Sequence, residues 1–205
     1  MNVRWLSLLL FFCLVLHAAP PPPTIVFLGD SLTAGYGLEN PLAEAYPALI
    51  QEKLRAAGLP HRAVNAGISG DTTAGGLRRL NWILRQPVDV LVIALGGNDG
   101  LRGIDPAVTR DNLQGIIDRT RENYPAARLV LAGMQMPANM NEEFTRAYRE
   151  IFPALAEANG IALIPFLLEG IGADPAFNQP DLIHPTAAGQ VIIADTVWKH
   201  LRPVL

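Results

Sequence analysis

Short apolar runs alternate with longer helical patterns along this chain from Thr24 onward, and this alternation limits the folds open to it. The runs that we expect to form strands are residues 25–28, 63–65, 88–95, 128–132 and 161–165. The third is nearly continuously apolar, which is typical of a strand covered on both faces. Alternating strands and helices predict βαβ units, and therefore a parallel sheet with helices on both faces in one α/β domain over residues 24–205.

The segments between these runs carry apolar residues with the helical period of 3.6. One helical face is formed by Leu113, Ile116, Ile117, Thr120 and Tyr124, and another by Phe144, Ala147, Tyr148, Ile151, Phe152 and Leu155. Pro47 suits the first position of a helix, because proline lacks only an N–H that would be unpaired there. Pro153 falls inside the second face and predicts a kink.

The first 19 residues have the pattern of a secretory signal peptide. Residues 1–19 combine Arg4, an apolar run over 5–16, and small residues at Ala18 and Ala19. The run is shorter than the roughly 20 residues that a helix needs to cross a bilayer. We therefore expect cleavage near these alanines, a periplasmic or secreted protein and no stable membrane insertion; an uncleaved anchor is the alternative.

Composition narrows the function classes further. The chain has 205 residues, a formal net charge of −3 and a single cysteine, Cys13, which the signal would remove. The mature chain then has no thiol for disulfides or cysteine chemistry. The slightly acidic balance argues against a nucleic-acid partner, because such proteins present a basic face. Residues 20–23 are all proline and predict a short extended spacer before the domain.

Polar and glycine-bearing blocks follow several of the predicted strands. They are residues 29–33, 65–71 and 96–100, with a further block, residues 181–185, before the last helix. In open α/β sheets, ligands bind outside the carboxyl ends of the strands. These four blocks are therefore the places to look for a functional site.

A serine and a histidine in these blocks suggest nucleophilic catalysis. Ser31 follows the first strand, but a serine there is more often a helix N-cap, and position 33 is Thr where the Gly-x-Ser-x-Gly elbow has Gly. Its hydroxyl would need a base. His184 follows Asp181 by three residues, a spacing that lets the carboxylate orient the imidazole. A capping aspartate and a surface histidine are an equally good account of this pair.

Acyl transfer also requires donors for a developing oxyanion. Gly67 has no Cβ to block an approach to its backbone N–H, and Asn98 can supply a side-chain N–H from the end of the central strand. Each has an ordinary explanation as well, Gly67 as a turn residue and Asn98 as a loop cap. Their occurrence together with Ser31 and His184 at successive strand ends favours catalysis.

The four blocks, in this order, resemble those of the SGNH (GDSL) hydrolases, named for their Ser, Gly, Asn and His. Within that family the chain is similar to the TesA-type bacterial arylesterases, which are also thioesterases and lysophospholipases. The segments that carry this second resemblance are residues 68–72, 95–103 and 136–139. The resemblance implies a flavodoxin-like three-layer α/β/α sandwich of about five parallel strands.

The same resemblance implies roles for individual residues. Ser31 would be the nucleophile, His184 the base and Asp181 its partner. The oxyanion hole would be formed by the Ser31 and Gly67 N–H groups and the Asn98 side chain. One departure is Leu182, where relatives often carry Gly between the aspartate and the histidine, so the turn here has its own geometry.

Apolar residues near the strand ends suggest where a substrate would bind. By the resemblance, the loop at about residues 100–105 is a mobile substrate-recognition loop. Core packing explains any one of the apolar side chains, but together they can line an acyl groove, in which methionines adapt to varied chains. We expect the substrate to be bound by Leu101, Ile104, Met136 and Pro137, with Met134, Phe166 and Leu168 nearby.

The sequence therefore predicts a periplasmic or secreted serine esterase, a monomer that needs no cofactor or metal. Its substrates would be small carboxylic esters, acyl thioesters or lysophospholipids. Three alternatives remain open: a carbohydrate O-acetylesterase with the same catalytic residues, a secreted binding module, and a metal-dependent phosphoesterase. The last would use Asp30, Asp99, Asp181 and His184. Otherwise we expect Asp30 and Asp99 to brace their loops through hydrogen bonds.

Overall fold

A computed structural model describes residues 21–137 and 139–205 of the chain. The predicted signal peptide, residues 1–19, lies outside the described residues. Residues 21–23, the described part of the proline run, precede the first strand without regular secondary structure. Among the described residues, no helix is both long and apolar enough to span a bilayer.

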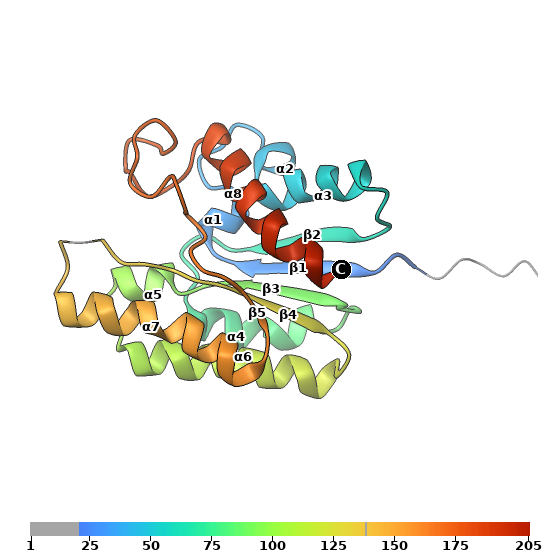
Figure 1. The fold of residues 1–205 in the computed structure, drawn as a ribbon, viewed down its shortest axis with the longest axis horizontal. Helices are drawn as coiled ribbons and strands as arrows, with labels where there is room; N and C mark the ends of the chain where they lie inside the picture. The colour runs from blue at the N-terminus through green and yellow to red at the C-terminus, as the bar shows by residue number, and fades with distance from the viewer. Residues whose placement is uncertain (1–20, 138) are drawn as a thin grey trace, which may run out of the picture.

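The centre of the molecule is a single sheet of five parallel strands, as the alternation of strands and helices predicts (Figure 1). Its strands are β1 (Thr24–Gly29), β2 (Arg62–Gly67), β3 (Val90–Ala94), β4 (Arg128–Ala132) and β5 (Ala162–Ile164). Their order in the sheet is β2-β1-β3-β4-β5. The chain thus begins near the middle of the sheet and adds strands outward on either side, which brings the carboxyl ends of β1 and β3 side by side.

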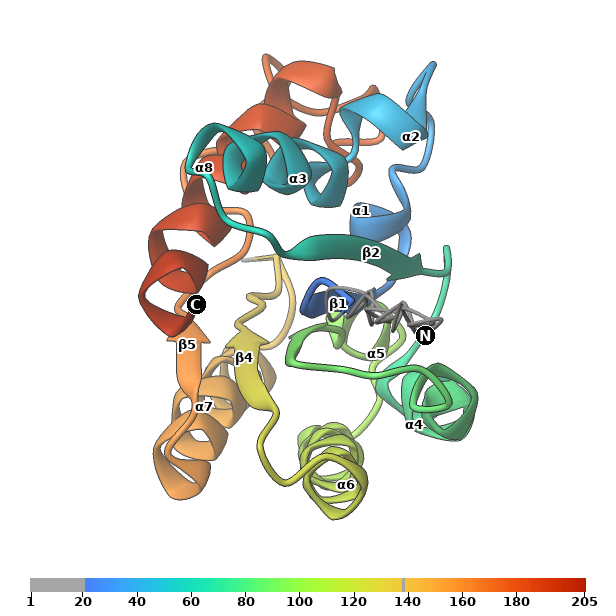
Figure 2. The same cartoon turned by 90° about the vertical axis from the view of Figure 1, so that its right-hand side faces the viewer.

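Helices cover both faces of the sheet, which gives the three layers seen end-on in Figure 2. One face carries α2 (Pro41–Glu44), α3 (Tyr46–Ala56) and α8 (Ala187–Leu201), and the other carries α4 (Thr73–Ile83), α6 (Pro106–Asn123) and α7 (Glu142–Asn159). Two short helices, α1 (Ser31–Ala34) and α5 (Gly97–Leu101), begin just after β1 and β3. A 3₁₀ turn, η1 (Arg202–Val204), ends the chain.

The core follows the apolar pattern of the sequence. All five residues of β3 are buried, which is expected for a central strand covered on both faces. The predicted helical faces pack inward: Leu113, Ile116, Ile117 and Thr120 of α6 and Tyr148, Ile151, Phe152 and Leu155 of α7 are buried. Pro47 is the second residue of α3 rather than the first, and α7 continues through Pro153.

The two edges of the sheet, where the strands end and where they begin, carry different parts of the chain. The four polar blocks stand at the carboxyl edge of the strands, on the left in Figure 1, where the long segment 165–186 also returns across the sheet. The strands begin at the opposite edge. The chain's last residue lies there too, because the Leu205 carbonyl accepts a hydrogen bond from Arg128 at the start of β4. The edge with the polar blocks is therefore free of both ends of the described chain.

Candidate active site

Ser31 is the first residue of α1, immediately after β1, and its side chain is largely buried. The cap of this helix is Asp30, whose Oδ1 accepts a hydrogen bond from the Leu32 N–H at 3.0 Å. Because the aspartate fills the capping position, capping does not account for the serine. The Ser31 hydroxyl is left to make other contacts, and its N–H has no acceptor within its own helix.

The Ser31 hydroxyl meets the histidine from the far end of the chain. Its Oγ lies 3.0 Å from Nε2 of His184, across a separation of 153 residues. Nδ1 of His184 lies 2.7 Å from Oδ2 of Asp181. The hydrogen bond from the imidazole, followed by those from the His184 and Ile183 N–H groups, lowers the pKa of Asp181 to about 2. The carboxylate therefore stays ionised beside the ring at neutral pH.

The turn between Asp181 and His184 is closed by its own backbone. The other oxygen of Asp181, Oδ1, accepts from the N–H groups of Ile183 at 2.9 Å and His184 at 3.0 Å. Leu182, between Asp181 and Ile183, has a φ of +60°, a left-handed conformation that glycine adopts freely and other residues rarely adopt. The departure from glycine noted in the sequence therefore leaves the turn intact but places a leucine in a strained conformation.

Tyr36 packs against the imidazole, a contact that the sequence analysis missed. The centroids of the Tyr36 and His184 rings are 4.6 Å apart. Tyr36 follows Gly35, which ends α1 in the left-handed conformation. The Tyr36 carbonyl accepts a hydrogen bond from Gln179 at 2.7 Å. No local motif signals this contact, because it joins segments that are far apart in the sequence.

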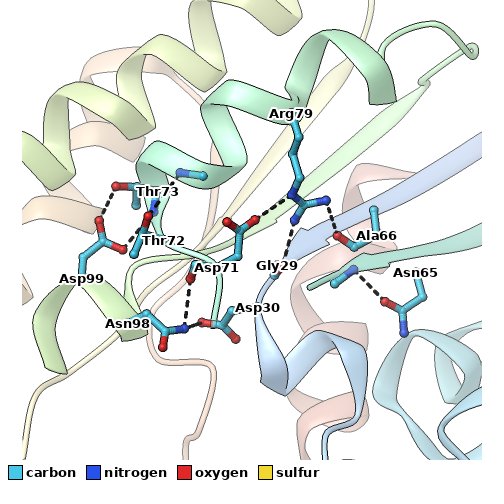
Figure 3. Close-up of polar contacts among 12 residues, drawn as sticks. Gly29, Asp30, Asn65, Ala66, Asp71, Thr72, Thr73, Arg79, Asn98 and Asp99 are labelled. Carbon is cyan, nitrogen blue, oxygen red and sulfur yellow. Dashed lines mark hydrogen bonds and ion pairs between the residues drawn. The ribbon is translucent and has the colours of Figure 1, made fainter. Parts of the chain in front are cut away.

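Asn98 lies on α5, where β3 ends, and its amide faces the loops that follow β1 and β2 (Figure 3). Its Nδ2 donates to the Asp71 carbonyl at 3.0 Å and, over a longer 3.3 Å, to Oδ2 of Asp30. Burial raises the pKa of the Asp30 carboxyl to about 6. Asp30 therefore has a local structural role at both oxygens, as a helix cap and as a partner of the Asn98 amide.

Arg79, on α4, joins the ends of β1 and β2 to the loop that follows β2 (Figure 3). Its Nε donates to Oδ2 of Asp71 at 2.7 Å. Its two terminal nitrogens donate to the carbonyls of Ala66, at 2.7 Å, and Gly29, at 3.0 Å. The guanidinium and the Asp71 carboxylate are largely buried. One side chain therefore fixes the end of β1, the end of β2 and the residue that accepts from Asn98.

Gly67 does not present the free N–H expected from the sequence. That N–H donates to Oδ1 of Asn65 at 2.9 Å, and a Cβ on Gly67 would come within 2.3 Å of the Ala34 backbone nitrogen. The glycine is thus explained by its close approach to α1, which argues against a role as an oxyanion donor. Gly70, with a φ of +79°, lies in a turn closed by the Asp71 N–H. Its own N–H has no hydrogen-bond acceptor in the described part of the chain.

Asp99 is fully buried and faces away from Asp30. Its carboxylate accepts from the Thr73 N–H at 2.9 Å and from the Thr73 hydroxyl, which in turn accepts from Asn112 at 3.1 Å. The convergence that a phosphoesterase would need is therefore not formed. Within residues 21–137 and 139–205, no group of three or more His, Cys, Asp or Glu residues is arranged to hold a metal ion.

A cavity of about 460 Å³ opens beside Ser31, Asn98 and His184. Three of the four predicted substrate-binding residues, Leu101, Met136 and Pro137, line it. Ile104 does not; its N–H donates to the Asp99 carbonyl, which turns the chain back after α5. Other apolar lining residues are Met134, Phe166, Leu168, Ala173, Leu182 and Ile183. The last three lie on the segment that carries His184 and were not predicted as substrate contacts.

Comparison with known proteins places this arrangement in a family. Residues 27–192 match the model of the GDSL-like lipase/acylhydrolase family. The chain is 39% identical to the esterase TesA of Pseudomonas aeruginosa, over 97% of this chain and 99% of that one. It is 38% identical to thioesterase 1/protease 1/lysophospholipase L1 of Escherichia coli K12, over 98% of this chain and 94% of that one. An arylesterase of Vibrio mimicus is 37% identical over 97% of this chain and 98% of its own length.

Solved structures agree with the sequence comparison. The crystal structure of a TesA superposes with a TM-score of 0.84 at 40% identity, covering 89% of this chain and 99% of that one. The esterase EstA from a Pseudoalteromonas species, inhibited by monoethylphosphonate, gives a TM-score of 0.82 at 30% identity, with coverages of 88% and 97%. The chain therefore belongs to the GDSL-like lipase/acylhydrolase family and is an enzyme of the SGNH hydrolase class.

Proposed function

We propose that the chain is a serine esterase that cleaves carboxylic esters through an acyl-serine intermediate on Ser31. The observation that carries the proposal is the continuous contact from the Ser31 hydroxyl through the His184 ring to the Asp181 carboxylate, at the edge of an apolar cavity. The names of the relatives support aryl esters, acyl thioesters and lysophospholipids as substrates. In each of these an acyl group is bound to a leaving alcohol or thiol.

His184 acts first as a base and then as an acid. With its Nδ1 proton held by Asp181, Nε2 is free to take the proton of Ser31 as Oγ attacks the acyl carbonyl carbon. The carbonyl π electrons move to its oxygen, and the anion collapses by expelling the alcohol or thiol, which receives the proton from His184. Water then attacks the acyl-serine in the same way, releasing the carboxylic acid and restoring the Ser31 hydroxyl.

The negatively charged oxygen of this intermediate is held by three N–H donors from the loops that follow β1, β2 and β3. We assign these to the Ser31 N–H, the N–H of Gly70, and the Asn98 Nδ2 hydrogen that faces Asp30 over 3.3 Å, a long contact that an oxyanion would replace. Gly70 replaces Gly67 in this role because the Gly67 N–H is already bonded to Asn65. Gly70 also directly precedes Asp71, whose carbonyl accepts from the Asn98 amide. Fixed donors of this kind stabilise a developing negative charge without having to reorganise.

The proposed setting is the periplasm or the exterior of the cell, with residues 1–19 removed as a signal peptide. Every group of the proposed mechanism comes from one chain, so a monomer suffices. Export of the chain can be tested by fractionating the cells and sequencing the mature N-terminus. A mature chain that begins near Pro20 is expected, whereas an intact leader on a cytosolic enzyme would contradict this part of the proposal.

Ser31→Ala tests the nucleophile. Residues 21–205 contain only two serines, Ser31 and Ser69, so an organophosphonate that labels serine hydrolases has two candidate sites. We expect stoichiometric labelling of the wild type and of Ser69→Ala, and none of Ser31→Ala, which should also lose turnover of an aryl ester while keeping its fold. Substantial residual turnover in Ser31→Ala, or labelling that follows Ser69, would refute the proposal.

A further inference from the structure

Two residues other than glycine have a left-handed backbone within the described chain, and both line the cavity beside Ser31. They are Ala173, with a φ of +58°, and Leu182, with a φ of +60°. In this region the Cβ of an L-amino acid lies too close to the backbone, so such residues are strained. Conformational outliers of this kind tend to gather at ligand sites. That both border one cavity is therefore a clue to function.

The backbone hydrogen bonds explain the conformation of these residues but not their side chains. The Leu182 N–H donates to the Gln179 carbonyl at 2.8 Å, and the following N–H groups bind Asp181. At the other position, the Asp174 N–H closes a turn onto Ile171, with Ala173 in its third place, where glycine is usual. Glycine would make all of these bonds without strain. A leucine and an alanine at these positions therefore need another reason.

The cavity supplies that reason. Leu182 is 44% exposed and stands at its mouth beside Ile183, which is 43% exposed, and Leu101, which is 45% exposed. Large apolar side chains left half in water are unfavourable until something apolar covers them. Their place on the cavity wall next to Ser31 means that the acyl chain of a bound ester would cover them. The side chain of Leu182 would then contribute to binding only when the substrate has a chain long enough to reach it.

We propose that Leu182, with Ala173 beside the same cavity, is a specificity-determining residue that favours medium acyl chains over acetyl groups. The proposal rests on the proposed function, because it requires an ester bound at Ser31. It adds that the strain in the turn from Asp181 to His184 accompanies an apolar contact with the substrate. Replacing the leucine by glycine should then raise the stability of the fold and lower the preference for medium acyl chains.

Two substitutions separate the side chain from the strain. Leu182→Ala removes most of the side chain but keeps a residue that is strained at a φ of +60°, whereas Leu182→Gly removes both. We would measure kcat/KM for 4-nitrophenyl octanoate and 4-nitrophenyl acetate, together with Tm. Leu182→Ala should lower the octanoate-to-acetate ratio about tenfold, because the octanoate reaction loses more than the acetate reaction, with little change in Tm. Leu182→Gly should lower the ratio at least as much while raising Tm by about 2–4 °C.

Leu42→Ala and Leu42→Gly are the matched controls. Leu42 is 93% exposed on α2 and does not line the cavity, so neither change should alter the ratio, and glycine should not raise Tm. An active wild type whose ratio is unchanged in Leu182→Ala overturns this inference alone, as does a Tm that falls in Leu182→Gly. A wild type that hydrolyses neither ester overturns the proposed function and this inference with it.

Discussion

The two sides of the candidate active site are built in different ways. The oxyanion side consists of the loops after β1, β2 and β3, which buried charged and amide groups hold together: Arg79, Asp71, Asn98 and Asp30 (Figure 3). The His184 segment, residues 165–186, is a succession of turns with an exposed apolar rim and two left-handed residues other than glycine. The comparison teaches that the groups proposed to face the developing charge are fixed in a buried network, while those proposed to face the acyl chain lie on irregular backbone.

The largest effect that tests this contrast is expected on the oxyanion side. Asn98→Ala removes one of the donors to the anion and should lower kcat by about 10²–10³, because the lost bond matters most in the transition state. Steady-state kinetics on an aryl acetate measure it. Asn159→Ala is the control, since Asn159 makes its hydrogen bonds with α6 and the end of α7, away from the cavity. A change in KM alone would show that Asn98 only binds substrate.

The ionisation of two carboxyls, Asp30 on the oxyanion side and Asp181 on the His184 segment, should change the free energy of unfolding in opposite directions as the pH rises. Burial raises the pKa of Asp30 to about 6, so its ionisation destabilises the fold, and the free energy of unfolding should fall by up to about 3 kcal/mol as the pH rises from 4 to 6. The pKa of Asp181 is lowered to about 2, so its contribution is present above pH 4 and is lost as the pH falls from 4 towards 2. Together these two groups should place maximum stability near pH 4.

Denaturant unfolding across pH 3–7 checks this expectation, with Asp30→Asn as the variant that isolates the upper part of the profile. That variant should lose the decrease between pH 4 and 6 and keep the decrease below pH 4. If the wild type instead gained stability between pH 4 and 6, the assigned effect of burying Asp30 would be wrong. The lower part of the profile depends on all carboxyls with depressed pKa values, so Asp30 serves as the sharper probe.

The smallest of these effects is expected for Arg79, whose guanidinium contacts the ends of β1 and β2. Arg79→Lys can keep one of the three acceptors held by the guanidinium, because lysine has a single compact donor group. We expect kcat for an aryl acetate to fall about tenfold with little change in KM, since the oxyanion donors would be misplaced rather than lost. Arg119→Lys is the control, because Arg119 donates to a backbone carbonyl as Arg79 does, but to that of Leu77 on α4 rather than to one at the ends of β1 and β2. Equal losses in both variants would mean that Arg79 only stabilises the fold.

The sequence was most informative where the signal is local. The sheet, the burial of the central strand and the positions of Ser31 and Asn98 at strand ends follow from apolar periodicity and from the meeting of parallel strands at one edge. The pairing of His184 with Asp181 follows from a spacing of three residues. Those are relations between neighbours in the chain or between whole strands, and a sequence pattern records them directly.

What the sequence could not show depends on side-chain rotamers and on contacts between distant segments. The engagement of the Gly67 N–H by Asn65 requires the rotamer of the asparagine, and the ring of Tyr36 meets His184 only through the tertiary fold. Arg79 has no motif of its own, because two of its three partners are backbone carbonyls. Ile104 was apolar and near the site, yet its backbone turns away after α5. The apolar character of its side chain and its place in the sequence do not distinguish Ile104 from Leu101.

The parallel sheet also determines where a tag, a support or a second domain can be attached without blocking the cavity. The first strand starts, and the chain ends, at the edge opposite the cavity (Figure 1). A tag, a solid support or a second domain joined after Leu205 would therefore leave the mouth of the cavity pointing outward. Immobilisation through the carboxyl terminus should preserve access for bulky, slowly diffusing esters.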